Sequence, residues 1–276
     1  IRKPIVITND MFARGVYFIV IGLFKKAVIS DYISLNFVDR VFDNPSLYSG
    51  LENLLGIYGY AMQIYCDFSG YSDMAIGIAL LLGFHFPLNF NAPYSAVSIT
   101  DFWRRWHISL STWIRDYIYI SLGGNRKGKV RQYFNLILTM LLGGLWHGAS
   151  LNFIAWGGMH GVALAAHKVF STGVLKHKRD YKSKGIRRIF GIFITFNFVC
   201  FTWLFFRNTS FDTSIVMLNR IVYEFHPELF LQLIDGYKYV FALMLLGYIT
   251  HFIPNRWQEG IISGIKRTND VIDALL

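Results

Sequence analysis

The segment GGLWHGAS, residues 143–150, places an ionisable ring inside a stretch that has no Lys, Arg, Asp or Glu between residues 132 and 166. A neutral imidazole can take a proton from a hydroxyl group and return it later. The glycines beside His147 leave room for a ligand or for another helix. On this pattern two interpretations of His147 stay open: a general base, or a packed histidine that donates one hydrogen bond.

The segment DFWRRWHISLSTWIRDYIYIS, residues 101–121, combines aromatic, basic and titratable side chains. On a helix its aromatic residues fall within about 80° of one another, and its arginines lie away from that stripe. The pattern predicts an amphipathic helix at the membrane interface or a re-entrant element. Such arginines hold either the phosphates of a cytosolic ligand or anionic lipid headgroups. The stripe contains Trp103, Trp106, Leu110, Trp113 and Tyr117, and the arginines are Arg104, Arg105 and Arg115.

Further titratable residues extend the set that can do chemistry. His107 borders the aromatic stripe. Asp116 follows Arg115, and it either pairs with a local arginine or orients a histidine as the carboxylate of a triad does. Asp67 and Asp73, between two apolar stretches, fit proton or ion sites in a transporter and hydrogen-bonded structural residues in an enzyme. We favour the structural role for this pair.

A second glycine-flanked histidine, His160 in GGMHG, follows His147 by 13 residues. A hairpin over residues 132–166 brings the two rings to a similar depth. No cysteine or carboxylate lies nearby in that hairpin, so a metal site is not expected. Packing is the expected role of His160.

The composition places these residues in a membrane protein. Hydrophobic residues make up 54% of the 276 residues and charged residues 16%, whereas soluble domains carry about a quarter charged residues. Mean hydropathy is +0.38. The net charge of +10 comes from basic residues between apolar blocks, which indicates cytoplasmic loops and not nucleic-acid binding. Cys66 and Cys200 both lie in apolar stretches, so we expect small core or lipid-facing residues without a disulfide.

Membrane-spanning helices must position the candidate residues, and each needs about 20 mostly apolar residues. As one helix, residues 132–166 would measure about 52 Å, so we expect a hairpin that breaks at HGASLN. This arrangement places His147 about 22 Å from the cytoplasmic side. The other expected spans are residues 11–30, 51–66, 71–86, 189–206 and 239–253.

The distribution of charge predicts the orientation. Residues 168–188 hold eight Lys or Arg and one Asp, so this loop and the basic segment 125–131 are expected in the cytoplasm. Residues 207–238 hold three Lys or Arg and four acidic residues, which suits the opposite side. The chain begins at Ile1 without an initiator Met, and we expect it to be part of a longer protein.

Three segments together resemble the membrane-bound O-acyltransferases. Within that family the resemblance is strongest to the bacterial branch that contains the membrane subunit for alginate O-acetylation. Subunits for peptidoglycan and cellulose O-acetylation and the D-alanyl transferase of teichoic acids are relatives of this branch. The resemblance runs from about Phe12 to about Phe206. The three segments are QIYCDFSGYSDMAIGIALLLGF, DFWRRWHISLSTWIRDYIYISLGGNRKG and NLILTMLLGGLWHGASLNFIAWGGMHG.

The resemblance implies an all-α integral membrane protein, in which a multi-helix bundle with re-entrant or interfacial helices surrounds a central tunnel. It implies one membrane domain over residues 1–276, with its motif core at about 51–166 and further helices upstream of Ile1. The family's catalytic histidine falls on His147. Its second polar position falls on His107 or, ranked lower, on Asp116. Donor binding is expected at Arg104, Arg105, Trp103, Trp106 and Arg115, and the tunnel lining at Trp146, Gly144, Gly148, Asn152 and His160.

The implied reaction moves an acetyl group from a cytosolic donor, expected to be acetyl-CoA, across the bacterial inner membrane. No other cofactor is expected. The expected acceptor is an extracytoplasmic partner of the SGNH-hydrolase type, which passes the acetyl group to a polysaccharide such as alginate. Contacts with membrane lipid are expected, and contacts with nucleic acid are not.

Other functions stay open at this point. The same fold also serves D-alanyl transfer and the O-acylation of peptidoglycan or cellulose. From the residues alone, a proton-coupled transporter that uses Asp67, Asp73, His147 and His160 is a different class of function. A scaffold that gathers extracytoplasmic proteins is a third class.

Overall fold

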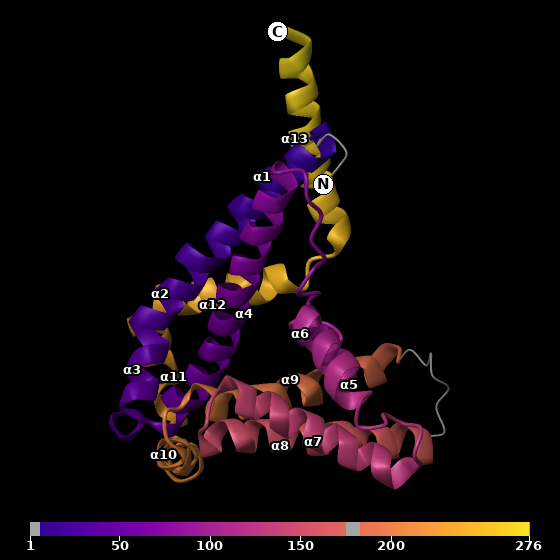
Figure 1. Cartoon of the computed structure of the whole chain (residues 1–276). Coiled ribbons are helices and arrows are strands. Elements are labelled where there is room, and N and C mark those ends of the chain that lie inside the picture. The colour runs from indigo at the N-terminus through magenta and orange to yellow at the C-terminus, as the bar shows by residue number, and fades with distance from the viewer. Residues whose placement is uncertain (1–5, 175–182, 276) are drawn as a thin grey trace. The chain divides into compact units, whose positions relative to one another are not determined.

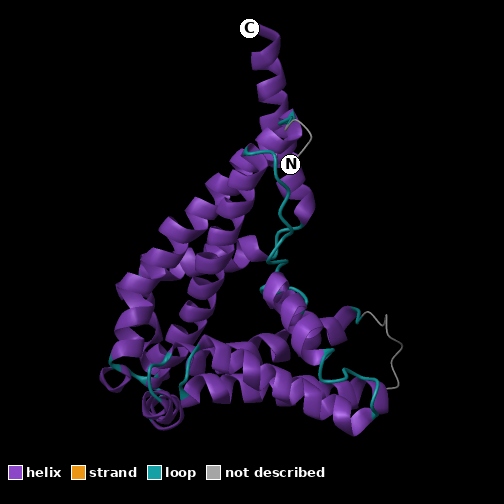
Figure 2. Ribbon diagram, in the orientation of Figure 1, coloured by secondary structure: helices purple, strands orange, loops and turns teal. Residues whose placement is uncertain are grey.

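The computed structural model describes residues 6–174 and 183–275. Every regular element within these ranges is helical, which confirms the all-α fold class (Figure 2). The chain forms two compact units. Unit 1 comprises Ile1–Asp39, Gly59–Asn89 and Gln232–Leu276, and unit 2 comprises Arg40–Tyr58 and Phe90–Leu231. The middle of the basic loop predicted at 168–188 lies outside the described residues.

Unit 1 is built on long helices, with α1 and α13 packed side by side (Figure 1). The side chain of Thr8 caps α1 by accepting a hydrogen bond from the backbone N–H of Met11 at 3.2 Å. The elements are α1 (Asn9–Leu23), η1 (Phe24–Ser30), α2 (Asp31–Ile33), η2 (Ser34–Val38), most of α4 (Gly50–Leu81), most of α11 (Phe230–Gly236), α12 (Lys238–His251) and α13 (Asn255–Leu275).

Helices α1 and α4 meet at paired glycines. A Cβ added at Gly22 would lie 2.6 Å from the carbonyl oxygen of Gly70, and one added at Gly70 would lie 2.7 Å from that of Gly22. Gly15 and Gly77 repeat the arrangement, with Cβ-to-oxygen separations of 3.0 and 2.6 Å. Each pair is displaced by seven residues, about two helical turns, from the other. The backbones approach so closely that only glycine fits at these contacts.

The charges of this glycine-containing region are paired between helices. Nζ of Lys25 lies 2.7 Å from Oδ2 of Asp73, and Nζ of Lys26 lies 2.5 Å from Oδ1 of Asp67. The Lys25 and Asp73 side chains are only 20% and 14% exposed. Removing one partner of such a pair leaves a poorly solvated charge, so each pair ties η1 to α4.

The two separate spans expected at residues 51–66 and 71–86 are wrong. Helix α4 runs without a break through the first and into the second, over 32 residues from Gly50 to Leu81. The acidic segment 67–73 remains helical because lysines of η1 neutralise its carboxylates. The glycine in that segment, Gly70, is an inter-helix contact and not a hinge.

Unit 2 contains the segments with the candidate residues. Its long helices α7, α8 and α9 pack in sequence, α7 against α8 and α8 against α9 (Figure 1). The elements are α3 (Asp39–Asp43), η3 (Pro45–Leu47), the start of α4, η4 (Pro93–Ser95), α5 (Ile99–Trp103), α6 (Ile108–Trp113), η5 (Ile114–Tyr119), α7 (Lys129–His147), α8 (Leu151–Lys168), η6 (Val169–Val174), α9 (Gly185–Arg207), α10 (Phe211–Tyr223) and η7 (Pro227–Leu229).

The hairpin predicted over residues 132–166 is confirmed. Helix α7 ends at His147, and the Ser150 side chain caps α8 by accepting from the backbone N–H of Asn152 at 3.3 Å. Gly144 and Gly157 form the close contact between the arms. A Cβ added to either would lie 3.3 Å from the Cα of the other and would overlap a backbone carbonyl group of the facing helix.

Residues 101–121 do not form one continuous helix. Helix α5 ends at Trp103, α6 begins at Ile108, and a π-helical segment follows from Ile114. The reason for the break is the backbone of His107, which has φ 42° and ψ 57° in the left-handed region and therefore cannot continue a right-handed helix.

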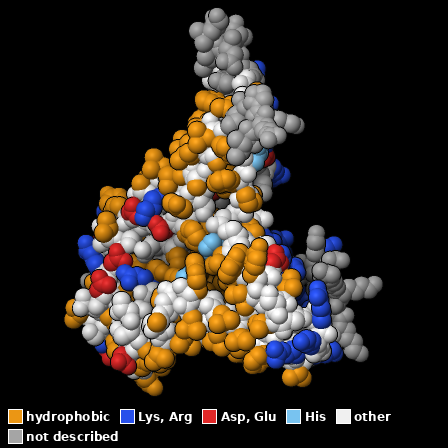
Figure 3. All heavy atoms as spheres, viewed as in Figure 1, with side chains coloured by type: hydrophobic (Ala, Val, Ile, Leu, Met, Phe, Trp, Pro, Cys, Tyr) orange, Lys and Arg blue, Asp and Glu red, His pale blue; other side chains and the backbone are white. Residues whose placement is uncertain are grey.

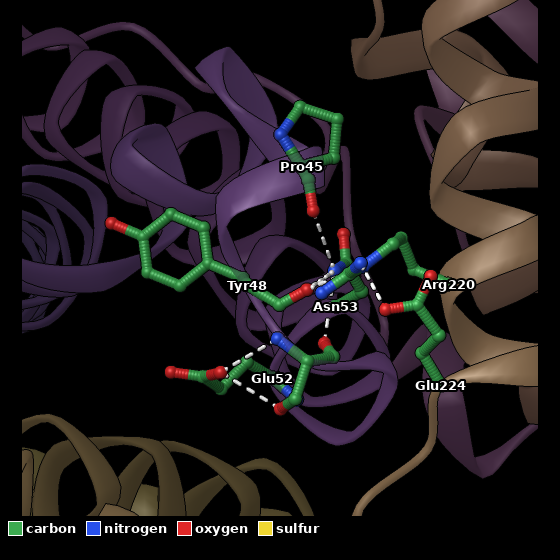
Figure 4. A network of polar contacts seen from close by, with 7 residues as sticks. Pro45, Tyr48, Glu52, Asn53, Arg220 and Glu224 are labelled. Carbon is green, nitrogen blue, oxygen red and sulfur yellow. Dashed lines mark hydrogen bonds and ion pairs between the residues drawn. The ribbon is translucent and has the colours of Figure 1, made fainter.

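Hydrogen bonds connect the start of α4 to the end of α10 (Figure 4). Ser49 and Glu52 form a capping box, in which the Glu52 carboxylate accepts from the Ser49 backbone N–H at 2.8 Å. The Asn53 side chain donates to three backbone carbonyl groups. Nε of Arg220 donates to the Tyr48 carbonyl oxygen at 2.9 Å. These bonds satisfy the backbone carbonyl groups of Pro45, Tyr48 and Ser49 within unit 2.

By length and hydropathy, α9 is the one described helix able to cross a membrane by itself. A second candidate is the pair Pro227–Gly236 and Lys238–His251, whose helices meet at 93°. Helix α9 contains the span expected at 189–206, and α12 covers most of the span expected at 239–253. Hydrophobic side chains cover much of the face seen in Figure 3. Cys66 and Cys200 are both buried and free, which agrees with the core placement and not the lipid-facing one.

Candidate active site

His147 stands where the α7–α8 hairpin turns. It is the last residue of α7 and is half-buried. Its ring lies against Trp146, Trp156 and Phe206, with centroid distances of 4.9, 5.4 and 5.0 Å. A Cβ at Gly148 would lie 2.7 Å from the Phe153 ring. Glycine at 148 therefore lets that ring approach the turn that carries the histidine.

His107 stands at the second helix break. It has the left-handed backbone of a residue outside regular structure, a conformation that costs about 1–3 kcal/mol for a residue other than glycine. The Trp106 carbonyl group at the break accepts a hydrogen bond from the Ser111 hydroxyl at 3.0 Å. Strained backbone in an ordered region is concentrated at functional sites, so the conformation supports a role for His107.

The structure places His107 and His147 in the same part of unit 2. Trp106, which precedes His107, packs on Trp203, and the Phe206 ring contacts both Trp203 and His147. Both lie in unit 2 and both are partly buried. Forty residues separate them in sequence, and each projects from an interrupted helix. Two imidazoles so placed can share the tasks of proton acceptor and hydrogen-bond partner for one hydroxyl group.

Asp116 is engaged elsewhere. The exposed Arg115 guanidinium donates to its two carboxylate oxygens at 2.7 and 3.1 Å. These bonds hold the pKa of the Asp116 carboxyl below its usual value. Of the two roles expected for Asp116, the structure shows the ion pair with a neighbouring arginine. Its role as a catalytic residue stays a prediction.

The adjacent arginines occupy different environments. Arg104 is exposed. The Arg105 guanidinium donates to Oδ1 of Asp101 at 2.9 Å and to the carbonyl oxygen of Asn91 at 3.2 Å. The Asn91 N–H donates back to the Arg105 carbonyl group at 2.9 Å. Arg105 therefore fastens the preceding loop to α5, whereas Arg104 is available to a ligand.

The tryptophans of the aromatic stripe also differ in their burial. Trp106 is 4% exposed and packs on Trp203 at 5.0 Å. Trp103 donates a hydrogen bond to His160. Trp113 is 50% exposed and stacks on Tyr117 at 5.5 Å. The first half of the segment is thus part of the unit 2 core and the second half is surface.

The residues expected to line a tunnel differ in exposure: Trp146 is exposed, whereas Asn152 and His160 are buried. Trp146 is 64% exposed beside His147. Asn152 is 1% exposed and donates to the Asn208 carbonyl oxygen at 2.7 Å. Gly144 packs against α8, and His160 is fully buried. The tunnel itself stays a prediction.

Sequence reasoning missed two buried tryptophans near His147. Trp156 and Trp203 are 2% and 1% exposed, and their rings stack at 6.1 Å. Neither indole nitrogen has a hydrogen-bond partner within the described part of the chain. The signals available in sequence were the four-residue spacing of Trp156 and His160 on α8 and the three-residue spacing of Trp203 and Phe206 on α9.

Basic side chains gather at the far end of the hairpin from His147. Figure 3 shows Lys and Arg at one end of α7 and α8. The exposed residues there are Arg126, Lys127, Lys129 and Arg131. A helix of 19 residues, about 28 Å long, separates this basic end from the histidine.

The chain resembles known proteins over most of its length. The model of the membrane-bound O-acyltransferase family, MBOAT, matches residues 3–209. The peptidoglycan O-acetyltransferase of Helicobacter pylori is 44% identical over 210 residues, covering 76% of this chain and 39% of that protein. A probable alginate O-acetylase, AlgI, of Azotobacter vinelandii is 48% identical over 207 residues, covering 75% and 40%.

A relative with lower sequence identity is named for transfer of D-alanyl and not of acetyl. The teichoic acid D-alanyltransferase of Bacillus subtilis is 34% identical over 217 residues, covering 73% of this chain and 52% of that protein. The chain thus spans between about two fifths and one half of the length of the curated relatives described here.

Proposed function

This chain belongs to the membrane-bound O-acyltransferase family, and on that premise we propose that it is part of a membrane enzyme that transfers an acyl group to a hydroxyl acceptor. The acyl group is acetyl, and acetyl-CoA in the cytosol is the donor. The acceptor lies outside the bacterial inner membrane. The names of the relatives, two O-acetylating and one D-alanylating, support acyl transfer in the cell envelope.

The observation that carries the proposal is the placement of His107 and His147 at two helix ends in unit 2, joined by the ring contacts of Trp106, Trp203 and Phe206. In the proposed reaction His147 takes the proton of the acceptor hydroxyl as its oxygen attacks the thioester carbonyl carbon. The carbon–sulfur bond breaks, and the proton passes from the imidazolium to the thiolate leaving group. His107 supplies the second polar contact to the reacting groups. The aromatic rings around His147 keep bulk water away from the thioester.

The donor side of the proposal rests on exposed cations. Arg104 is exposed three residues before His107. It is suited to hold a donor phosphate by charge-assisted hydrogen bonds. The exposed basic segment at the start of α7 attracts the polyanionic donor from the cytosol. The proposal assigns this contact to Arg104 and not to Arg105, because the Arg105 guanidinium already donates to Asp101.

The acceptor is proposed to be an extracytoplasmic protein of the SGNH-hydrolase type, which passes the acetyl group to a polysaccharide such as alginate. A bilayer separates a polar donor from a polar acceptor on its other side. A protein-lined route would let both reach the same central base. D-alanyl transfer is the alternative that a relative's name favours.

The test is His147→Ala in the full-length protein, with the exposed His85→Ala as the matched control. Membranes receive labelled acetyl-CoA, and release of acetyl from the donor and acetylation of polysaccharide are both measured. His147→Ala is expected to lose both signals at normal protein abundance, while His85→Ala keeps both. Transfer at the wild-type rate in His147→Ala would refute the mechanism. Transfer from a D-alanyl donor alone would select the alternative.

A further inference from the structure

His160 lies near His147, and both of its ring nitrogens form hydrogen bonds within the described structure. It is fully buried on α8 between α5 and α9. Nε1 of Trp103 on α5 donates to its Nδ1 at 3.2 Å. Its Nε2 lies 2.9 Å from Oγ1 of Thr202 on α9. A buried imidazole without such partners would be costly, so these two bonds account for its presence in the core.

The partners define where the proton of His160 lies. An indole nitrogen only donates, so Nδ1 must be the acceptor and carries no proton. The Thr202 hydroxyl donates its own proton to the Val199 carbonyl oxygen at 2.8 Å. It therefore accepts from His160, and Nε2 is protonated. The network selects the neutral Nε2–H tautomer of His160.

This fixed ring contacts Trp103, on the segment that leads to His107, and Trp156, which contacts His147. Trp103 lies at the end of α5, four residues before His107, on the chain that leads into the break. Trp156 packs against His160 at 4.9 Å and against His147 at 5.4 Å. Trp103 and Trp156 also touch each other, at 5.8 Å and 71°. A rotation of the His160 ring would displace the supports of both histidines.

We propose that His160, held as the neutral Nε2–H tautomer by Thr202, is a positioning residue that sets the distance between His107 and His147 through Trp103 and Trp156. The proposal rests on the proposed function, since it assigns the two histidines to one reaction. His160 itself touches no reacting group. It acts by fixing the Trp103 indole and by supporting the Trp156 ring.

The experiment separates the two bonds of His160 in the full-length protein. His160→Asn places an amide oxygen near the Nδ1 position and keeps an acceptor for Trp103. His160→Gln places its amide near the Nε2 position, so it keeps the Thr202 bond and loses the Trp103 bond. Trp103→Phe removes the donor and keeps a ring. The control is Thr100→Val, which removes the 2.9 Å contact of Thr100 with His167 between the same two helices.

We expect kcat to fall about tenfold in His160→Gln and in Trp103→Phe. The KM for the donor is expected to stay unchanged in His160→Gln, because His160 is fully buried and is not a donor-binding residue. His160→Asn is expected to keep more of kcat than His160→Gln, and Thr100→Val is expected to keep the wild-type kcat. A purely structural role would lower abundance in all three cluster variants alike and leave kcat per folded molecule unchanged. That result would overturn the proposal. Where His160 variants do not accumulate, Trp103→Phe decides by the same criterion.

A second measurement needs no activity. In protein labelled with ¹⁵N-Trp and ¹⁵N-His, the Trp103 indole resonance should move upfield in His160→Gln and not in Thr100→Val. The His160 ring should show a proton on Nε2 and none on Nδ1. A proton on Nδ1, or an unchanged Trp103 resonance in His160→Gln, would overturn the inference. If His147→Ala keeps activity while these resonances behave as expected, the proposed function fails and the Trp103–His160 bond stands.

Discussion

The neighbouring arginines Arg104 and Arg105 should respond to mutation in opposite ways. Arg105 donates to Asp101 at 2.9 Å and to the Asn91 carbonyl oxygen at 3.2 Å, and its side chain is 30% exposed. Hydrogen bonds of charged groups contribute about 1.5–3 kcal/mol each when buried, whereas exposed ion pairs contribute about 0–1 kcal/mol. For this partly exposed side chain, Arg105→Ala should cost about 2 kcal/mol of folding free energy. At about 2–4 °C per kcal/mol, the melting temperature should fall by about 4–8 °C.

Arg104→Ala should leave the melting temperature within about 1 °C of wild type, because surface substitutions usually change stability by less than about 0.5 kcal/mol. It should raise the KM for the acyl donor about fivefold, as expected for a lost phosphate contact of about 1 kcal/mol.

The assay combines thermal unfolding in detergent with initial rates at varied acetyl-CoA concentration. Arg105→Lys is the informative control, since it keeps the charge but cannot reach both acceptors. It should lose most of the stability that Arg105→Ala loses. The reasoning is refuted if Arg105→Ala melts at the wild-type temperature and raises the KM, or if Arg104→Ala lowers stability without affecting the KM.

Three further predictions concern packing, strain and charge. Gly157→Ala should lower the melting temperature of the protein, because a Cβ there meets the backbone of α7; the adjacent Gly158→Ala, whose Cβ would lie 3.5 Å from a leucine methyl group, should not. His107→Gly should lose activity yet match or exceed the thermal stability of His107→Ala, because glycine adopts positive φ without strain; a lower stability than that of His107→Ala would contradict this explanation. Lys25→Met should cost about 3 kcal/mol or more by leaving Asp73 unpaired, whereas adding Asp73→Leu should recover most of that loss. Equal unfolding midpoints for the single and double variants would show that the pair is not coupled.

The paired carboxylates also bear on the transporter alternative. Asp67 and Asp73, proposed as steps of a proton path, both form ion pairs with lysines of η1. The structure thus supports the structural role favoured for them. To carry protons, each carboxylate would have to break its ion pair with lysine and bind a proton in every transport cycle. Acetylation without ion dependence, in the assays above, would exclude the transporter.

Several features of the fold were predictable because they depend on local sequence. The absence of charge between residues 132 and 166 and the glycine-containing turn predicted the hairpin, and α7 and α8 are its arms. The apolar stretch at 189–206 predicted α9. The charged segment 67–73 misled the prediction, because its neutralising lysines lie more than 40 residues away in sequence and no local rule reveals them.

The amino-acid sequence alone determined that the chain is helical, rich in apolar segments and supplied with histidines at two unusual positions. Residue type and spacing express these properties directly, through hydropathy and helical period. Only the tertiary structure decided that ring contacts join the segments of His107 and His147. It also decided that Arg105 is hydrogen-bonded while Arg104 is exposed, and that His160 lies between Trp103 and Thr202. Those outcomes depend on which side chains reach one another after distant helices pack, and a one-dimensional pattern does not specify such contacts.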